Sequence, residues 1–162
     1  MNWAKTKTFK RHYELREGDR VVASLKFEGL CGSLATAHAG KESWTLKRSG
    51  FLRPRVTVRQ AGSEAELAVF EPRWTGSGTL RFSDGRTFQW EHLRFWSSQW
   101  GWTRGDEQVL VRINANLTGS RAKIEMGAGV KPIPETLLLV IVGWYLQQLM
   151  NQDAASTVVI TS

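Results

Sequence analysis

Residues 134–150 read PETLLLVIVGWYLQQLM, and this stretch decides the fold of the chain. The helix that it predicts is apolar on every side, because the run from 137 to 146 contains no charged residue, amide or hydroxyl other than that of Tyr145. A helix without a polar face has to be enclosed by protein or by lipid. The uninterrupted run spans ten residues, whereas a helix that crosses a bilayer needs roughly 20. We therefore predict a helix that is enclosed by protein, without a transmembrane segment.

The flanks of this stretch set the expected ends of the helix. Pro134 suits the first helical turn, where its missing N–H is not needed, and Glu135 suits the positive end of the helix dipole. Residues 153–155 are predicted to end the helix. Residues 157–161 read TVVIT and predict a closing strand.

Most of the preceding 130 residues alternate between apolar and polar side chains, which is typical of strands with one buried face. Turn-forming residues such as Glu17-Gly18-Asp19 and Ser49-Gly50 separate these segments. The predicted strands cover 6–16, 20–27, 43–48, 52–59, 63–70, 78–90 (a hairpin), 93–103, 108–114 and 121–126. The region with Gly29, Gly32 and Gly40 gives a weaker pattern.

The segment 78–90 predicts a hairpin with a defined register. A two-residue Asp84-Gly85 loop would place Leu80 and Phe82 on one face and Phe88 and Trp90 on the other. A three-residue loop over 83–85, with Gly85 at positive φ, places all of these apolar residues on one face. We prefer the three-residue loop, because the alternative exposes half of the apolar set.

These elements predict a single domain over residues 1–162, mainly β, with about ten to twelve short strands and one helix. A sheet of this size tends to curl or close, and closure into an antiparallel barrel removes exposed edges. A wide barrel needs an interior filling. The helix over 134–150 would be roughly 25 Å long at 1.5 Å per residue, which suits a barrel axis. We predict a closed β-barrel around a C-terminal hydrophobic helix.

The order of elements, with PETLLLVIVGWYLQQLM followed by STVVIT, resembles that of the tubby-like superfamily. This superfamily includes the C-terminal domain of tubby proteins, phospholipid scramblases and plant LURP-one-related proteins. The resemblance covers nearly the whole chain and implies an antiparallel barrel closed around a hydrophobic helix near the C-terminus. The cysteine cluster for acylation and the acidic calcium loop of scramblases are missing. The resemblance implies binding of phosphoinositide or other anionic lipid headgroups.

Two other architectures remain as alternatives. A lipocalin-like fold would place eight strands before an amphipathic helix that packs outside the barrel, and the fully apolar run argues against it. A β-rich domain with a C-terminal membrane tail is disfavoured by the short run and by the lack of Lys or Arg after it.

The charge distribution points to an anionic partner. Residues 1–60 hold 13 Lys and Arg against five Asp and Glu, whereas residues 61–162 hold nine against ten. The net charge of +7 therefore belongs to the N-terminal part. Such asymmetry is typical of proteins that meet a membrane surface, a nucleic acid or an acidic protein, and the alternative is a solvated face that aids solubility.

The sequence gives no case for an enzyme, a metal site or a cofactor. His12, His38 and His92 lack the spacing of metal ligands and are expected at surfaces or turns. Cys31 is expected to be a buried, inert thiol. Asp84 is expected to have a structural role in its turn. With one cysteine and no apolar stretch of signal-peptide length in MNWAKTKTFKRHYEL, we expect a cytoplasmic protein, with peripheral membrane association as an option.

The best candidate site is a set of basic residues that no acidic residue interrupts. In the strand over 52–59, Leu52, Val56 and Val58 share one parity with Pro54, and the arginines take the other side. Arginines on one strand face could bind phosphates through paired hydrogen bonds. The candidate anion-binding residues are Lys47, Arg48, Arg53, Arg55 and Arg59.

Three functions are consistent with these features. We favour a non-enzymatic binding module that docks on anionic membrane lipid or another polyanion through its basic N-terminal half. Nucleic acid is the less favoured polyanion, because Trp96, Trp100 and Trp102 lie far from the arginines in sequence and are expected in the core. The first alternative is a scaffold that binds an acidic protein partner. The weaker alternative is an apolar-ligand carrier, which needs an empty barrel.

Overall fold

The chain folds into a closed β-barrel that surrounds an α-helix, as the computed structural model shows. The structure describes residues 1–6, 11–94, 97–105 and 108–161. The strands are β1 (Asn2–Lys5), β2 (His12–Glu17), β3 (Arg20–Phe27), β4 (Ala35–Ala39), β5 (Glu42–Ser49), β6 (Arg55–Gln60), β7 (Glu66–Pro72), β8 (Gly78–Phe82), β9 (Thr87–His92), β10 (Gln99–Arg104), β11 (Gln108–Ala115) and β12 (Arg121–Met126). The helix α1 spans Pro134–Thr161.

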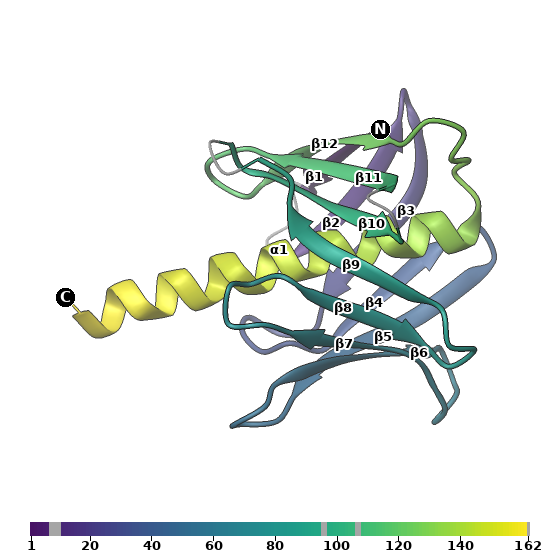
Figure 1. Ribbon diagram of the computed structural model, residues 1–162. Helices are drawn as coiled ribbons and strands as arrows, with labels where there is room; N and C mark the ends of the chain where they lie inside the picture. The colour runs from purple at the N-terminus through teal and green to yellow at the C-terminus, as the bar shows by residue number, and fades with distance from the viewer. Residues whose placement is uncertain (7–10, 95–96, 106–107, 162) are drawn as a thin grey trace.

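The strands form one ring in chain order. Each strand pairs antiparallel with its neighbours along the chain, and β1 also pairs with β12 (Figure 1). Trp3 of β1 makes this closure, because it lies opposite Leu15 of β2 and Ala122 of β12. The prediction of a mainly β, closed antiparallel barrel of about ten to twelve strands is confirmed, with twelve strands.

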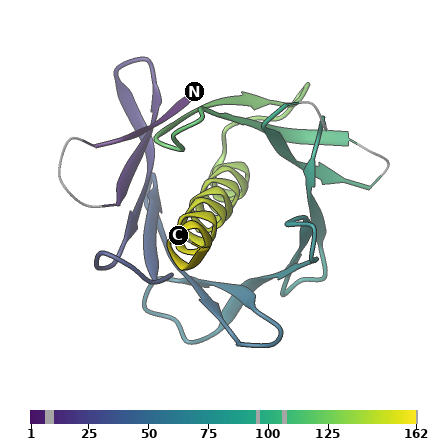
Figure 2. The same cartoon turned by 90° about the vertical axis from the view of Figure 1, so that its left-hand side faces the viewer.

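The helix runs through the interior of the barrel, with strands on every side of it (Figure 2). Ile141, Val142 and Trp144 have no solvent exposure, although they point in different directions around the helix. The predicted enclosure by protein is confirmed, and the alternative with a helix outside the barrel is wrong. Among the residues that the structure describes, no helix has both the length and the hydrophobicity needed to cross a bilayer.

Small residues allow α1 to approach two sides of the wall closely. A Cβ atom added to Gly143 would lie 2.6 Å from Ile113 Cδ1 and 2.8 Å from Trp90 Cζ3. On the other side, the inward-facing residues of β4 are alanines: Ala35, Ala37 and Ala39. The backbone of α1 therefore lies closest to β3, β4, β10 and β11.

The hairpin of β8 and β9 has the predicted register. The apolar residues all face the core: Leu80, Phe82, Phe88 and Trp90. The Phe82 N–H donates to the Arg86 carbonyl over 2.9 Å, which leaves residues 83–85 as a three-residue loop, and Gly85 has a φ of 91°. Asp84 accepts a hydrogen bond from the Arg86 N–H, and this bond is the main cause that lowers the pKa of the Asp84 carboxyl.

Sequence reasoning missed β1 and β4 and placed the starts of β2 and β6 too early. β1 is only four residues long, and β4 (ATAHA) is rich in alanine, which is depleted in strands. The predicted strand over 6–16 begins at His12 as β2, and Phe9, once expected in that strand, lies outside the described residues. The predicted strand over 52–59 begins at Arg55, because Pro54 has no N–H for a ladder. Leu52 and Arg53 thus belong to a loop.

The end of the helix was also predicted wrongly. Residues 153–155 do not end α1, and residues 157–161 are helical rather than a closing strand. Ala154 and Ala155 favour helix, and the hydroxyls of Ser156 and Thr157 donate to the carbonyls of Gln152 and Asp153 one turn back. In Figure 1 this last part of α1 projects beyond one end of the barrel. We call that end the exit end.

Candidate functional site

The loops of the exit end carry exposed, large apolar side chains. Because the strands are antiparallel, every second connecting loop lies at this end, and the described residues of these loops include 28–34, 50–54, 73–77, 93–94, 97–98 and 116–120. Leucine, phenylalanine or tryptophan side chains that are at least 87% exposed occupy four of these loops: Leu30, Phe51, Leu52, Trp74 and Leu117. Exposed apolar groups concentrated on one region mark interaction sites.

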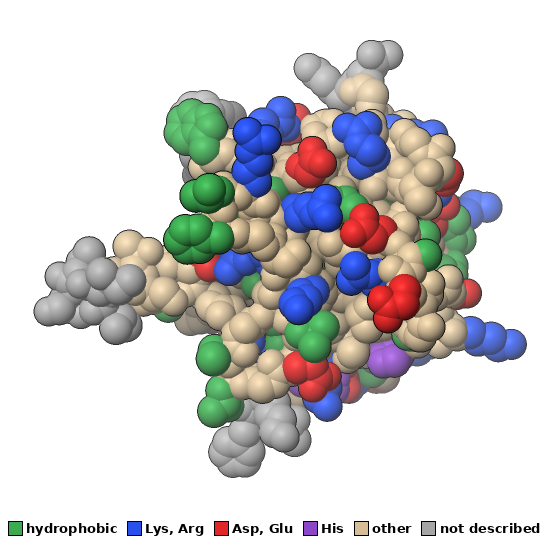
Figure 3. Space-filling model, turned by 90° about the horizontal axis from the view of Figure 1, so that it is seen from below, with side chains coloured by type: hydrophobic (Ala, Val, Ile, Leu, Met, Phe, Trp, Pro, Cys, Tyr) green, Lys and Arg blue, Asp and Glu red, His purple; other side chains and the backbone are tan. Residues whose placement is uncertain are grey.

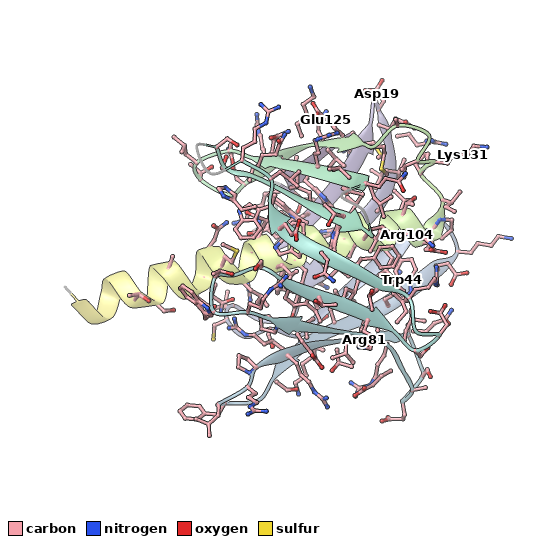
Figure 4. All side chains as sticks on the ribbon, in the orientation of Figure 1. Asp19, Trp44, Arg81, Arg104, Glu125 and Lys131 are labelled. Atoms are coloured by element: carbon pink, nitrogen blue, oxygen red, sulfur yellow. The ribbon has the colours of Figure 1, made fainter. Side chains whose placement is uncertain are left out.

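The opposite end of the barrel lacks this concentration. Within the described ranges, its large exposed apolar residues are Val21 at 44% and Ile133 at 50%. Asp19 lies at the tip of the β2–β3 hairpin, and Lys131 lies in the segment that leads from β12 into α1 (Figure 4). Where α1 begins, Arg86 forms an ion pair with Glu135. The two ends therefore differ in chemistry, although the same strands build both.

The predicted basic set does not form one face. Lys47 is exposed on the outside of β5, whereas Arg48 has the parity of Trp44 and Leu46 and turns into the mouth of the barrel. There the Arg48 guanidinium donates to both Asp153 carboxylate oxygens of α1, over 2.7 and 2.9 Å. These hydrogen bonds are the main cause that raises the pKa of Arg48. Arg48 thus holds the helix rather than an external anion.

The arginines of β6 have an acidic neighbour on the next strand. Arg55 and Arg59 each lie 3.8 Å from Glu66 of β7, and Arg59 also donates to the Glu64 carbonyl over 3.1 Å. Blue and red side chains are accordingly mixed on the side of the barrel that includes β5, β6 and β7 (Figure 3). Arg53 lies at the exit end, in the loop before β6. The prediction that Arg53, Arg55 and Arg59 share one strand face is wrong for Arg53, whereas Arg55 and Arg59 both lie on β6 and both reach Glu66.

The exit end gathers a different group of arginines. Arg53 and Arg94 are exposed and make no ion pair with any residue that the structure describes. Arg73, next to Trp74, donates to the neutral Gln89 amide oxygen over 3.2 Å. Sequence reasoning missed Arg73 and Arg94, because each is a lone basic residue. Their shared feature, a position in a loop at the same end, depends on the strand order.

Hydrogen bonds connect two of these loops, 28–34 and 116–120, to α1. The Tyr145 hydroxyl donates to the Ser33 carbonyl over 2.6 Å, and burial raises the pKa of Tyr145 to about 12. Gln148 donates to the Gly119 carbonyl over 2.9 Å. Arg11 donates to the Gly32 carbonyl and to the Gln152 side chain, over 3.0 and 2.8 Å. The exposed apolar tips are therefore carried by loops with defined positions.

The described side chains that could take part in catalysis or metal binding are not gathered into one site. Cys31, predicted to be buried, is exposed in the loop 28–34. In the described part of the chain, no group of three His, Cys, Asp or Glu side chains is arranged to hold a metal ion. Trp102 is buried, and Trp100 stacks on Trp90 at 5.6 Å between ring centroids. Trp96 lies outside the described residues.

Comparison of the chain with models of known protein families, with curated proteins and with solved structures finds no match. The resemblance to the tubby-like superfamily therefore stays a prediction, and the inference of function depends on the geometry of the exit end.

Proposed function

We propose that this protein is a non-enzymatic binding module that docks the exit end of its barrel on a membrane containing anionic lipids. One observation carries the proposal: large apolar side chains on separate loops are exposed together at one end, among arginines. The space-filling view shows hydrophobic side chains along the edge from which the helix projects (Figure 3).

The chemistry of the exit end suits the border between lipid headgroups and acyl chains. Fully burying a leucine or phenylalanine side chain contributes roughly 1.5–3 kcal/mol, and tryptophan is favoured at such borders. Each arginine near an anionic bilayer contributes on the order of 1 kcal/mol. Single contacts of this size are weak, so docking depends on several loops that reach the same surface together.

The projecting part of α1 has to enter the lipid layer when the loops dock. From Ala154 onward the sequence carries no charged residue, so the desolvation cost of inserting a charged side chain does not arise. Asp153, the last charged residue, is paired with Arg48 at the mouth. We therefore expect the exposed Ala155 to lie among lipid headgroups or deeper.

This orientation differs from the docking expected from the sequence alone. Of the predicted basic set, Arg53 lies in an exit-end loop and makes no ion pair with any described residue. Arg48 pairs with Asp153, and Arg55 and Arg59 lie near Glu66. The barrel interior is filled by α1, which takes most of the space that an apolar-ligand carrier would need. An acidic protein partner explains the arginines but not the apolar tips.

Sedimentation with lipid vesicles tests the proposal. We expect the wild type to bind vesicles of phosphatidylcholine and phosphatidylserine more tightly than vesicles of phosphatidylcholine alone, and to bind less as salt is added. Trp74→Ala and Leu117→Ala should each weaken binding about tenfold, the effect of ~1.4 kcal/mol. Ile133→Ala is the matched control, because Ile133 is an exposed apolar residue at the opposite end. Ala155→Asp should weaken binding without unfolding the protein.

The outcomes separate the possible partners. If Trp74→Ala and Ile133→Ala weaken vesicle binding equally, docking by the exit end is contradicted. A wild type that ignores both kinds of vesicle at low salt would refute membrane binding. If that wild type bound polyglutamate instead, the scaffold that recognises an acidic protein would be the better function.

A further inference from the structure

A cavity of about 220 Å³ opens at the exit end, between α1 and the wall formed by β5, β6 and β7. Its apolar lining comes from two sides. The wall contributes Val56 and Phe70, and the helix contributes Leu146, Leu149 and Met150. All of these except Met150 are buried, so the cavity extends into the apolar interior of the barrel mouth.

Two features of the chain explain why this space is open. The backbone of α1 lies closest to β3, β4, β10 and β11, which leaves the β6–β7 side of the mouth wider. At the edge of the cavity, Gly76 has a φ of 87° and no side chain. A Cβ atom there would approach Met150 Cε to 3.7 Å. The loop 73–77 therefore passes the cavity without filling it.

A second hollow of about 710 Å³ adjoins the cavity, between the loops 50–54 and 73–77. The two spaces share four lining residues: Pro54, Arg55, Pro72 and Arg73. Leu52 and Trp74, two of the exposed tips, also line the outer hollow. The combined space thus leads from the proposed docking surface to the interior of the mouth.

The outer hollow is positively charged. Its charged lining residues are Arg53, Arg55, Arg73 and Glu71. Arg53 makes no ion pair with any described residue, and Arg55 has Glu66 only at 3.8 Å. A phosphate group has the charge and the acceptors that arginines bind in pairs. The inner cavity is mainly apolar, and its lining also includes the mutually paired Arg48 and Asp153. A mainly apolar cavity behind a basic hollow matches an amphiphile with an anionic head.

We propose that the two spaces bind one phosphate-bearing lipid, with its phosphate in the outer hollow and part of one acyl chain in the cavity. This inference rests on the proposed function, because it makes the hollow a specific lipid site within the docking surface. Arg55 and Arg73 border both spaces, so they would lie where head and chain meet.

Calorimetric titration in solution separates this site from membrane docking. The probe is a lysophosphatidic acid below the concentration at which it forms micelles, so no bilayer is present. We expect it to bind the wild type, whereas glycerol 3-phosphate, which has no chain, and a monoacylglycerol, which has no phosphate, should bind at least about tenfold more weakly. A lipid that binds only when presented in vesicles would contradict the site.

Two kinds of variant test the two halves of the site. Met150→Trp should fill the cavity and weaken lysophosphatidic acid binding at least about tenfold, while sedimentation with anionic vesicles is retained. Ile133→Trp is its control at the opposite end. Arg73→Gln should weaken binding of the same probe about tenfold. Arg81→Gln, on the exposed outer face of β8 (Figure 4), should leave it unchanged.

The results distinguish the two proposals. If the wild type sediments with vesicles but does not bind the lysolipid, or if Met150→Trp binds it as well as the wild type does, the lipid site is refuted and docking stands. If the wild type binds neither vesicles nor the lysolipid, both proposals fail. If Arg73→Gln binds the lysolipid as tightly as the wild type does, the phosphate lies elsewhere and the proposed position of the head is contradicted.

Discussion

Replacing Leu139 with alanine tests whether the helix is the core of the barrel. Leu139 is 1% exposed in the second turn of α1, and the indole N–H of Trp102 in the barrel wall donates to the Leu139 carbonyl over 2.7 Å. The substitution keeps this hydrogen bond and removes most of the isobutyl group. The lost transfer free energy and the cavity left behind should together cost about 3–5 kcal/mol. The upper part of this range is expected, because the hydrogen-bonded ring of strands cannot collapse around the gap.

Urea unfolding followed by tryptophan fluorescence measures this cost. A loss of about 3–5 kcal/mol should lower the melting temperature by roughly 6–20 °C in a domain of this size. The matched control is Leu117→Ala, the same chemical change at a fully exposed loop residue. The control should alter the free energy of unfolding by less than about 0.5 kcal/mol. It should nevertheless weaken vesicle binding, whereas Leu139→Ala should bind vesicles normally while it is folded.

The reasoning would be refuted by a small effect at the buried position. If Leu139→Ala costs less than about 1 kcal/mol, or no more than Leu117→Ala, the helix does not fill the barrel under solution conditions. An unfolding transition that separates into two steps would show that the helix leaves the barrel before the strands unfold.

Further changes test other parts of the structure. Gly85→Val should cost more than about 1 kcal/mol in urea unfolding, because a β-branched residue resists the positive φ of this turn; an unchanged midpoint would contradict the hairpin geometry. Burial raises the pKa of Tyr145 from 10.0 to about 12 and also raises the pKa of Tyr13. Both phenols therefore keep their protons to a higher pH in the folded chain, so their contribution to stability is complete below pH 10 and is lost as the pH rises toward 12. Urea midpoints between these pH values should fall, and less steeply in Tyr145→Phe; equal slopes would contradict the burial of this phenol. Gly143→Val should lower the melting temperature markedly in a thermal scan, because its Cβ would already meet Ile113 and Trp90 within 3 Å.

The strongest sequence signals concerned burial, and these were confirmed. The helix over 134–150 has no polar face, so enclosure was the only arrangement consistent with its composition. The register of the β8–β9 hairpin followed from one requirement, a common face for Leu80, Phe82, Phe88 and Trp90. Both inferences rest on apolar side chains whose exposure to water would cost free energy. Such side chains form a pattern within a short stretch of sequence, so the buried face can be predicted from that stretch alone.

The errors concern segments whose structure depends on distant partners. β4 is a strand because Ala35, Ala37 and Ala39 leave room for α1, and alanines alone give no strand signal. Asp153, where the helix was predicted to end, is instead a helical residue whose carboxylate accepts hydrogen bonds from Arg48, 105 residues earlier in the chain. This partner is not visible in the local sequence, whereas Ala154 and Ala155, which favour helix, are.

The predicted basic set does not form one face, for a similar reason. Arg55 and Arg59 alternate cleanly in sequence, but the register between β6 and β7 brings Glu66 beside them. The exit end consists of single residues such as Leu30, Trp74 and Leu117, which lie more than 40 residues apart and gather only when the ring closes. A search of the sequence for large apolar residues within predicted turns would find these residues. It would not show that they lie at the same end of the barrel.

The single cysteine allows the central claim to be tested directly. Cys31 is exposed on an exit-end loop, so an environment-sensitive fluorophore can be attached to the native chain there. The protein used for comparison carries both Cys31→Ser and Lys41→Cys, so its label lies on an exposed turn at the opposite end. With anionic vesicles that contain nitroxide-labelled lipids, the label at position 31 should be quenched and shifted to shorter wavelength, whereas the label at position 41 should remain in water. Quenching at position 41 but not at position 31, or at neither position, would contradict docking by the exit end.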